Sequence, residues 1–500
     1  MNESKIIPQP LPGARTRVMN WNMTEQSSCY VFKAQDLAGI RQALTMARAN
    51  GLSIIPHGAG HSYTDAALNT DGILLDVTGM RRILSWDPEQ GIIQVEPGAT
   101  LREVVRVALP NHWWPAVTPS TADATIGGCV ALNVNGKNAW KCGSFGEHLL
   151  SLNVLLATGQ ELTLSPESDP ALFHAFVGSA GLLGIITSIT IQLEHVPSTQ
   201  VEIRMRPADS LGETLAIMQQ EQSADFLEAW VDSFATGGRL GRGVVTCTRY
   251  GEARDGFPAT TRPAGRMPAS RKSSLLKENF TRGLGQVGRP AVRLGVHTAA
   301  STLYWWTKWW DGRFTRRESL FDSTYYAPAI YTIYRALAPQ GTETFQAFVP
   351  ASQAEALFDE ILRRSQANGL ILLWSVIKRH RRDPFLLSYQ VDGFSLEVNY
   401  QVMPQVTARL GSLLRELMAR VVQAGGRFYF AKDSLLTNAL YRQSIGDVAV
   451  DTFLQLKRRY DPEMLLQSNL FRRVFLPTQE DTGAQGHGDA KTRERGDTGT

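Results

Sequence analysis

A histidine beside two glycines is the first feature of this sequence that could carry chemistry. The tetrad Gly58-Ala59-Gly60-His61 follows an apolar pair at residues 54–55. Glycine lets a chain turn sharply and approach a ligand closely, and successive N–H groups in such a turn bind an anion, most often a phosphate. Two glycines are also typical of an ordinary loop, and the Gly-x-Gly-x-x-Gly dinucleotide fingerprint is absent. The segment therefore predicts either a phosphate nest beside an imidazole or a plain turn.

Three more glycine-rich stretches follow, at residues 118–128, 133–146 and 178–184. Several ligand-ready turns close together in sequence favour one long ligand threaded through a domain. The hydroxyls and N–H groups around Ser120 and Thr125 are donors that a pyrophosphate needs. The alternative for Thr125 is a capped junction between a loop and a helix.

These residues resemble the vanillyl-alcohol-oxidase, or PCMH-type, family of FAD-linked oxidoreductases. Residues 58–62, 125–128 and 181–185 carry the general resemblance. Residues 135–138 and 431–434, with 143–146, look like its decaprenylphosphoryl-ribose oxidase branch. The resemblance runs from about residue 8 to residue 477 and is patchy between residues 198 and 390. It implies an α+β fold with a two-subdomain FAD-binding domain and a substrate (cap) domain built on an antiparallel sheet.

The domain division expected from the resemblance and the composition has four parts. Residues 1–197 form the FAD-binding domain, and residues 198–426 form the cap domain with a basic and aromatic insert at about 255–315. Residues 427–477 return to the FAD-binding domain. The polar, glycine-rich and charged tail, residues 478–500, is predicted to be disordered.

Composition narrows the class of protein. With 500 residues, 43% hydrophobic and 20% charged, the chain reads as a soluble globular protein of two domains. Its net charge of +4 is small for this length and by itself argues neither for nor against nucleic acid. No nucleic-acid partner is predicted. The four cysteines, Cys29, Cys129, Cys142 and Cys247, contain no Cys-x-x-Cys pair, so free thiols and no metal site are expected.

The N-terminus lacks the apolar core of a signal peptide, and no run of about 18 apolar residues exists. We therefore predict a cytoplasmic protein, either free or peripheral at the inner face of the membrane. Residues 1–28 are expected to be an irregular lead-in. A strand at 29–32, a helix capped by Asp36 and a strand at 53–55 that ends at Pro56 are then expected to deliver the glycine turn.

The resemblance implies FAD as the cofactor and assigns its contacts. The assigned cofactor-binding residues are Gly58, Ala59, Gly60, His61, Ser62, Tyr63, Ser120, Thr125, Ile126, Gly127, Gly128, Asn135, Gly143, Ile186 and Tyr429. In the similar aldonolactone and alditol oxidases a histidine at this place bonds covalently to the flavin 8α carbon, whereas the prenylphosphoryl-ribose branch has arginine and binds FAD noncovalently. We therefore predict an 8α-histidyl link through His61; as a bare histidine it would more simply be a hydrogen-bonded loop residue.

The catalytic residues expected from the resemblance are Lys432, Glu397 and Lys137. A lysine at the flavin ring would stabilise the anionic reduced ring; without the resemblance, Lys432 reads as an exposed strand tip. Glu397 replaces a flavin-facing cysteine of the branch. If it points inward it is expected to have a raised pKa suited to proton transfer, and if the register is off by one it lies on a solvated face.

Lys137 belongs to Asn135-Gly136-Lys137-Asn138, where the branch has histidine in place of Asn135. That substitution removes one candidate base and leaves Lys137 as a candidate for binding a substrate phosphate or hydroxyl. The residues assigned to the substrate are Trp230, Tyr326, Gln346, Lys378 and Ser395.

The predicted reaction is oxidation of a secondary alcohol of a sugar-type substrate, free or lipid-linked, by hydride transfer to flavin N5. Lys432, Glu397 or a water would remove the hydroxyl proton. One alternative is an aldonolactone or alditol oxidase that uses oxygen, which His61 favours. Another is a non-catalytic carbohydrate- or lipid-binding protein on a flavoprotein scaffold.

A basic and aromatic segment suggests a membrane surface as a further partner. Residues 262–293 hold eight basic residues against one acid, and residues 303–310 then read Leu-Tyr-Trp-Trp-Thr-Lys-Trp-Trp. Indoles beside cations suit the interface of a bilayer with anionic lipid. The segment 262–317 therefore predicts peripheral membrane contact; the alternative is a mobile surface loop followed by a packed aromatic helix.

Overall fold

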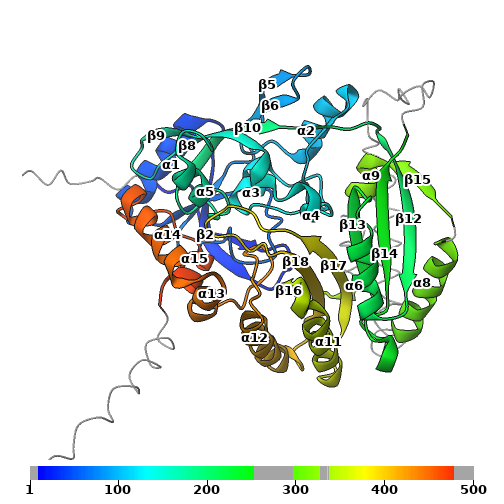
Figure 1. The fold of residues 1–500 in the computed structure, drawn as a ribbon. Helices are drawn as coiled ribbons and strands as arrows, with labels where there is room; N and C mark the ends of the chain where they lie inside the picture. Colours follow the sequence, from blue (N-terminus) through cyan, green and yellow to red (C-terminus); the bar gives the residue numbers. More distant parts are fainter. Residues whose placement is uncertain (1–9, 253–296, 313, 327–334, 336, 478–500) are drawn as a thin grey trace, which may run out of the picture.

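The computed structural model describes residues 10–252, 297–312, 314–326, 335 and 337–477, and at residues 297–300 only the backbone. Within these residues the chain is an α+β protein with three larger sheets (Figure 1). The predicted basic segment at 262–293 and the predicted disordered tail at 478–500 lie outside the described residues.

The first sheet delivers the glycine turn. Its strand order is β1 (Thr16–Met19), β2 (Gln26–Lys33), β4 (Ile73–Asp76) and β3 (Ile54–His57), and α1 (Leu37–Ala49) connects β2 to β3. The side chain of Asp36 accepts a hydrogen bond from Gly39 N and caps α1, as predicted. The expected irregular lead-in is wrong, because β1 pairs antiparallel with β2.

Pro56 does not end its strand as predicted. β3 continues through Pro56 to His57, parallel to β4. A proline is tolerated here because β3 is an outer strand of this sheet, where the ladder does not need every N–H group. On its free side Ile54 forms an isolated bridge with Leu466, far along the chain.

The second sheet is antiparallel and carries the next glycine-rich stretches. Its order is β5 (Ile83–Asp87), β6 (Ile92–Val95), β10 (Ile185–Gln192), β8 (Leu149–Leu155) and β9 (Glu161–Leu164). The helices α2 (Leu101–Ala108), α3 (Ile126–Ala131), α4 (Ala139–Cys142) and α5 (Pro170–Phe176) belong to this part of the chain, and β7 (Trp113–Trp114) pairs with β11 (Glu194–His195).

The third sheet has seven antiparallel strands. Their order is β15 (Arg316–Ser319), β12 (Gln200–Ala208), β14 (Gly243–Tyr250), β13 (Phe226–Val231), β17 (Leu372–His380), β18 (Gly393–Gln401) and β16 (Thr342–Pro350). α11 (Ala351–Ala367) covers the face that carries Tyr400, whose hydroxyl bonds Ser365 at 2.8 Å. Glu397 is three residues away and lies on the opposite face, because side chains alternate along a strand.

The remaining helices lie around this sheet. α6 (Leu211–Gln220) contacts α11 and β14, and α12 (Thr407–Gln423) contacts α11 and β16 (Figure 1). α8 (His297–Asp311) contacts β12 and β14, and α9 (Leu320–Thr324) follows β15. Tyr304 of α8 lies 4.8 Å from Trp230, whose cross-strand partner Val376 lies opposite Glu397. α8 is therefore on the Glu397 face of the sheet.

The last helices are α13 (Asn438–Ile445), α14 (Asp447–Tyr460) and α15 (Asn469–Phe475), and a buried lysine fastens them to the early turns. Lys457 is fully buried and pairs with Asp461 at 2.5 Å. Its Nζ also donates to the carbonyl oxygens of Leu182, at 2.7 Å, and Leu466, at 2.6 Å. This ammonium thereby joins the glycine-rich stretch 178–184 to the C-terminal segment.

Three absences hold for the described part of the chain. No helix there is both long and apolar enough to cross a bilayer. No group of His, Cys, Asp and Glu side chains there has the arrangement of a metal site. The four cysteines, all among the described residues, are free thiols.

Candidate active site

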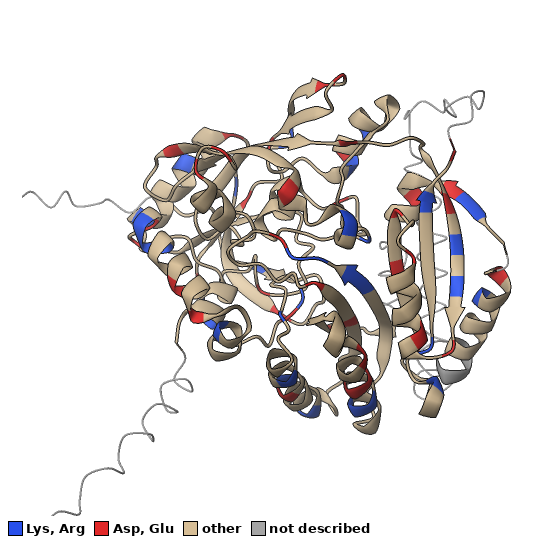
Figure 2. Cartoon of the chain, viewed as in Figure 1, with Lys and Arg blue, Asp and Glu red and all other residues tan. Residues whose placement is uncertain are grey.

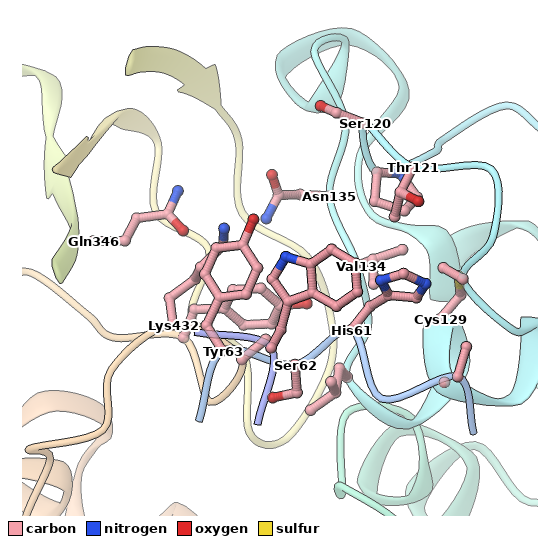
Figure 3. A pocket seen from close by; sticks show the side chains of 18 of the residues that line it. His61, Ser62, Tyr63, Ser120, Thr121, Cys129, Val134, Asn135, Gln346 and Lys432 are labelled. Carbon is pink, nitrogen blue, oxygen red and sulfur yellow. The ribbon is translucent and has the colours of Figure 1, made fainter. Parts of the chain in front are cut away.

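A cleft separates the two N-terminal sheets from the seven-stranded sheet, and it encloses about 1370 Å³ of space, its mouth included. Residues 58–63, 119–121 and 128–135 contribute to one wall, and β16, β17 and β18 contribute to the other. Residues 429–432 complete the lining. Figure 3 shows His61 on the side of Thr121 and Cys129, and Lys432 with Tyr63 on the side of Gln346.

At the glycine end of the cleft, neighbouring atoms leave little room for a side chain on the turn. A Cβ atom at Gly58 would overlap the hydroxyl oxygen of Thr125. Gly60 has a φ of +69°, which favours glycine. Thr125 caps α3 by accepting from Gly128 N at 3.3 Å, so the capped-junction interpretation is confirmed. Since Thr125, Gly58 and Gly60 also line the cleft, capping does not compete with ligand binding here.

His61 presents an imidazole to the cleft. Its ring centroid lies 4.4 Å from that of Trp21. Burial lowers the pKa of His61, an effect that Asp123 opposes. A neutral ring has a nitrogen lone pair available for bonding, which a protonated ring lacks.

Lys432 lies at the other end with 16% of its side chain exposed, so it is not the exposed strand tip of the simpler alternative. Its Nζ donates to Glu397 Oε1 at 3.0 Å and lies 3.5 Å from the centroid of the Tyr63 ring. Burial lowers the pKa of Lys432, while the Glu397 carboxylate opposes that effect. The backbone is fixed by Asp433, whose carboxylate accepts from Tyr429 N at 3.0 Å and from Gln346 N at 3.1 Å.

Glu397 points into the cleft, so the inward register is confirmed, but its expected raised pKa is wrong. Burial by itself would raise the pKa of Glu397, yet Lys432 and Lys378 outweigh it and the net shift is downward. Asn399 Nδ2 also donates to Glu397 Oε1, at 3.3 Å. Among the described residues none donates to Oε2, which leaves that oxygen for a ligand.

Lys137 is engaged behind the lining of the cleft. Its Nζ pairs with Glu228 at 2.8 Å, donates to Ser323 O at 3.1 Å and lies 4.2 Å from the centroid of the Tyr326 ring. Tyr326 lines the cleft, and its hydroxyl donates to Glu228 at 2.9 Å. Lys378 also lines the cleft, and no hydrogen bond or ion pair links its Nζ to any described residue. Lys378 is therefore better placed than Lys137 to meet an anionic group.

Two residues assigned to the substrate lie outside the lining. Ser395 is fully buried, where its hydroxyl accepts from Gln346 Nε2 at 3.2 Å and bonds His380 Nε2 at 2.8 Å. Trp230 packs against Tyr304 of α8. Ser395 reaches the cleft only through Gln346, which does line it.

The predicted cofactor-binding residues also divide into those that line the cleft and those that do not. Asn135, which donates to the Tyr389 hydroxyl at 3.1 Å, lines the cleft with Tyr429. Ile126, Gly127, Gly143 and Ile186 do not line it. The lining members are Gly58, Ala59, Gly60, His61, Ser62, Tyr63, Ser120, Thr125, Gly128, Asn135 and Tyr429.

Sequence reasoning missed Trp21, Trp374 and Asn399, which line the cleft. Trp21 sits in the supposed irregular lead-in, where no pattern marks it. Asn399 lies two residues beyond Glu397 on the same face of β18, so the alternation of a strand could have found it.

The cleft fits an extended flavin dinucleotide. Glycine backbone and the hydroxyls of Ser120 and Thr121 lie along one wall, where a pyrophosphate needs donors. Apolar side chains such as Val134 and Val376 suit a flat ring, and the mostly buried Lys432 supplies positive charge at the far end. The donor set and the overlap that a Cβ at Gly58 would cause both agree with a bound FAD.

Comparisons with known proteins agree with this geometry. Residues 29–165 match the FAD binding domain family model. The chain is 28% identical over 479 residues to decaprenylphosphoryl-beta-D-ribose oxidase of Mycolicibacterium smegmatis, covering 93% of this chain and 98% of that protein. It is 32% identical over 164 residues to L-gulono-1,4-lactone dehydrogenase of Mycobacterium tuberculosis, covering 31% and 35% of the two chains. It is 25% identical over 202 residues to D-lactate dehydrogenase of Anaerostipes hadrus, covering 38% and 42%.

Proposed function

We propose, from the premise that this chain is an FAD-dependent oxidoreductase of the vanillyl-alcohol-oxidase type acting on CH–OH groups, that it oxidises a secondary alcohol of a sugar-type substrate. The single observation that carries this proposal is the ion pair between Lys432 Nζ and Glu397 Oε1, which are 3.0 Å apart. Both residues line the cleft. The pair places a cation and an acceptor of protons together at the end of the cleft away from the phosphate-binding turns.

The chemistry that FAD supplies when bound is acceptance of a hydride at N5. The protein's own part is to orient the alcohol and take its proton. Lys432 holds Oε1 of Glu397, and Oε2, to which no described residue donates, is the oxygen we assign to accept the hydroxyl proton. Because the pKa of Glu397 is lowered, this carboxylate is ionised at neutral pH and free to accept a proton, and the same shift makes it a weaker base than an ordinary glutamate. Lys378 contributes a second positive charge on the same wall.

The reaction is tested by anaerobic bleaching of the flavin band at about 450 nm in FAD-replete protein. Three probes separate the substrate classes: ribose joined through a phosphate to a short prenyl chain, D-arabinono-1,4-lactone, and sorbitol. Bleaching by at least one probe is expected, slowed severalfold by deuterium at the carbinol carbon. Absence of bleaching by all three contradicts the proposal.

A second candidate, an aldonolactone or alditol oxidase that uses oxygen, is favoured by His61 lining the cleft. For either candidate we propose that His61 carries FAD through an 8α-histidyl bond, which its neutral ring supports. Reoxidation of the bleached flavin by air, compared with reoxidation by a dye, distinguishes an oxidase from a dehydrogenase.

The lipid-linked form of the substrate is supported by the exposed aromatic side of α8 and the residues just after it. The exposed apolar side chains there are Leu303 (66%), Trp306 (52%), Trp310 (59%) and Phe314 (66%). Figure 2 shows basic residues on the neighbouring strands β12 and β15, where Arg316 and Arg317 keep more than half of their side chains exposed. Indoles at headgroup depth with cations nearby are typical of peripheral membrane contact. The described residues from Leu303 to Arg317 therefore form the part of the proposed contact that can be tested.

The membrane contact is tested by flotation with vesicles of phosphatidylglycerol and phosphatidylcholine. We expect the protein to float with these vesicles, and the double variant Trp306→Ser, Trp310→Ser to remain at the bottom. Val448→Ser, which alters an apolar side chain that is 81% exposed on α14, is the matched control and should float like wild type. Wild-type protein that stays at the bottom contradicts the contact and leaves a free sugar substrate.

The proposed organisation assigns residues 1–197 to a two-subdomain FAD-binding domain and residues 198–426 to the cap. Residues 427–477 return to the first domain, which the contacts of Lys457 with Leu182 support. Flotation would support a place at an anionic membrane surface, and we propose that this is the inner face.

A further inference from the structure

A row of buried polar side chains leads away from Glu397 to the N-terminal part of the chain. Asn399 Nδ2 donates to Glu397 Oε1 at 3.3 Å, and Thr344 Oγ1 donates to Asn399 Oδ1 at 2.7 Å. Asn22 Nδ2 donates to Thr344 Oγ1 at 2.8 Å. Asn22, Thr344 and Asn399 are exposed by only 6%, 2% and 4%. The row is therefore held within the protein and ends at the cleft.

The direction of these hydrogen bonds is fixed by chemistry. The Thr344 hydroxyl has one hydrogen, which goes to Asn399 Oδ1, so it can only accept from Asn22. With its oxygen occupied, the Asn399 amide presents its NH₂ group to Glu397. Lys432 donates to the same oxygen of Glu397 from the other side. Each donor in the row therefore points to the next member in the direction of Glu397, where the row ends. An ionised carboxylate suits this end because it only accepts hydrogen bonds.

The far end of the row belongs to a segment outside the FAD-binding match, which begins at residue 29. The carbonyl oxygen of Asn22 accepts from Thr342 N at 3.1 Å, which fixes the segment to β16. Its neighbour Trp21 lines the cleft beside His61. The lead-in thus contacts the His61 end of the cleft through Trp21 and the Glu397 end through Asn22.

We propose that Asn22, Thr344 and Asn399 are positioning residues that hold the Glu397 carboxylate anionic and fixed against Lys432. The role in catalysis rests on the proposed function, whereas the hold on the carboxylate does not. Without the row, Glu397 would keep Lys432 but lose a charge-assisted donor, and it would be protonated at a higher pH.

The other groups around Glu397 set the sign of the pH dependence. The charged or titratable groups facing it are Lys432 from the 429–433 turn, Lys378 from β17 and Tyr326. Because the folded-state pKa of Glu397 is lowered, its stabilisation is present above the ordinary glutamate pKa and is lost as pH falls through the folded pKa. Breaking the row moves the folded pKa of Glu397 back toward the ordinary value, which reduces that acid-dependent loss.

The test compares the Tm of the FAD-replete protein from pH 7 down to about pH 3, below the ordinary glutamate pKa of about 4.3. Thr344→Val removes the hydroxyl and keeps the shape, so its Tm should be lower than that of wild type at every pH, because two buried hydrogen bonds are lost. The difference should shrink as the pH falls below about 4.3, where the wild-type carboxylate also becomes protonated. Thr344→Ser keeps the hydroxyl and should behave like wild type. Thr214→Val, which removes a buried hydroxyl bonded to Ser210 O in α6, should give a pH-independent difference.

A second set of variants tests whether ionisation of Glu397 itself causes the pH dependence. In Glu397→Gln protein, which cannot ionise at this position, the effect of Thr344→Val should lose its pH dependence. With any probe that bleaches the flavin, Thr344→Val should move the acid limb of the rate profile upward by about half a pH unit, roughly threefold in the ionised fraction below it. The proposal is overturned if the Tm difference caused by Thr344→Val is constant with pH. It is also overturned if that difference keeps the same pH dependence in Glu397→Gln protein. If the Tm result holds while no probe is oxidised, the positioning row stands and the proposed oxidation falls.

Discussion

Replacing Lys432 by Met is expected to lower the rate of flavin reduction by about 10²–10³-fold, the usual cost of losing one preorganised electrostatic contact in an active site. The ammonium is mostly shielded between Glu397 and the Tyr63 ring, so water would replace its charge only in part. Positive charge here also favours the anionic reduced flavin. The midpoint potential of the bound flavin should therefore fall, by roughly 30–60 mV. Stopped-flow reduction and dye-equilibrated potentiometry measure the two quantities separately.

The matched control is Lys141→Met, which removes a half-exposed ammonium paired with Asp225 at 2.7 Å. This variant should change the rate by less than about twofold, because exposed ion pairs contribute little. If the Lys432→Met protein retains FAD yet reduces it at a rate within about threefold of wild type, with an unchanged potential, Lys432 does not serve the reaction.

Replacing His61 by Ala is expected to convert all of the flavin from protein-bound to acid-extractable. In wild-type protein the covalent bond predicted at His61 keeps the yellow colour in the acid-precipitated pellet. The alanine variant should still bind FAD noncovalently, since the glycine turn and the hydroxyls of Ser120 and Thr121 remain. The measurement is flavin absorbance in the supernatant and the pellet, with the mass of the intact protein as the second readout.

His57→Ala provides the comparison within the same turn, because His57 bonds Ala67 O at 3.0 Å and does not line the cleft. Its flavin should stay in the pellet. Wild-type flavin that passes wholly into the supernatant shows that His61 makes no bond to it, and then the ring acts through contact alone.

The sequence by itself determined much of the local structure of the cleft. Gly58, Gly60 and His61 follow a short strand as predicted, and Asp36 caps the helix before it. These results depend on neighbours within a few residues, where residue type and spacing decide the backbone. The cap that Thr125 provides for α3 is local for the same reason.

Only the tertiary structure decided which charged groups meet. A shift of one residue in the register of β18 would turn Glu397 away from the cleft, and its lowered pKa comes from Lys432, which is 35 residues away in sequence. Packing also placed Lys378 at the cleft and held Lys137 behind it on Glu228. The bond from Asn22 to Thr344 spans 322 residues. No local pattern encodes such contacts, because the distances between sheets are set by the packing of the whole core.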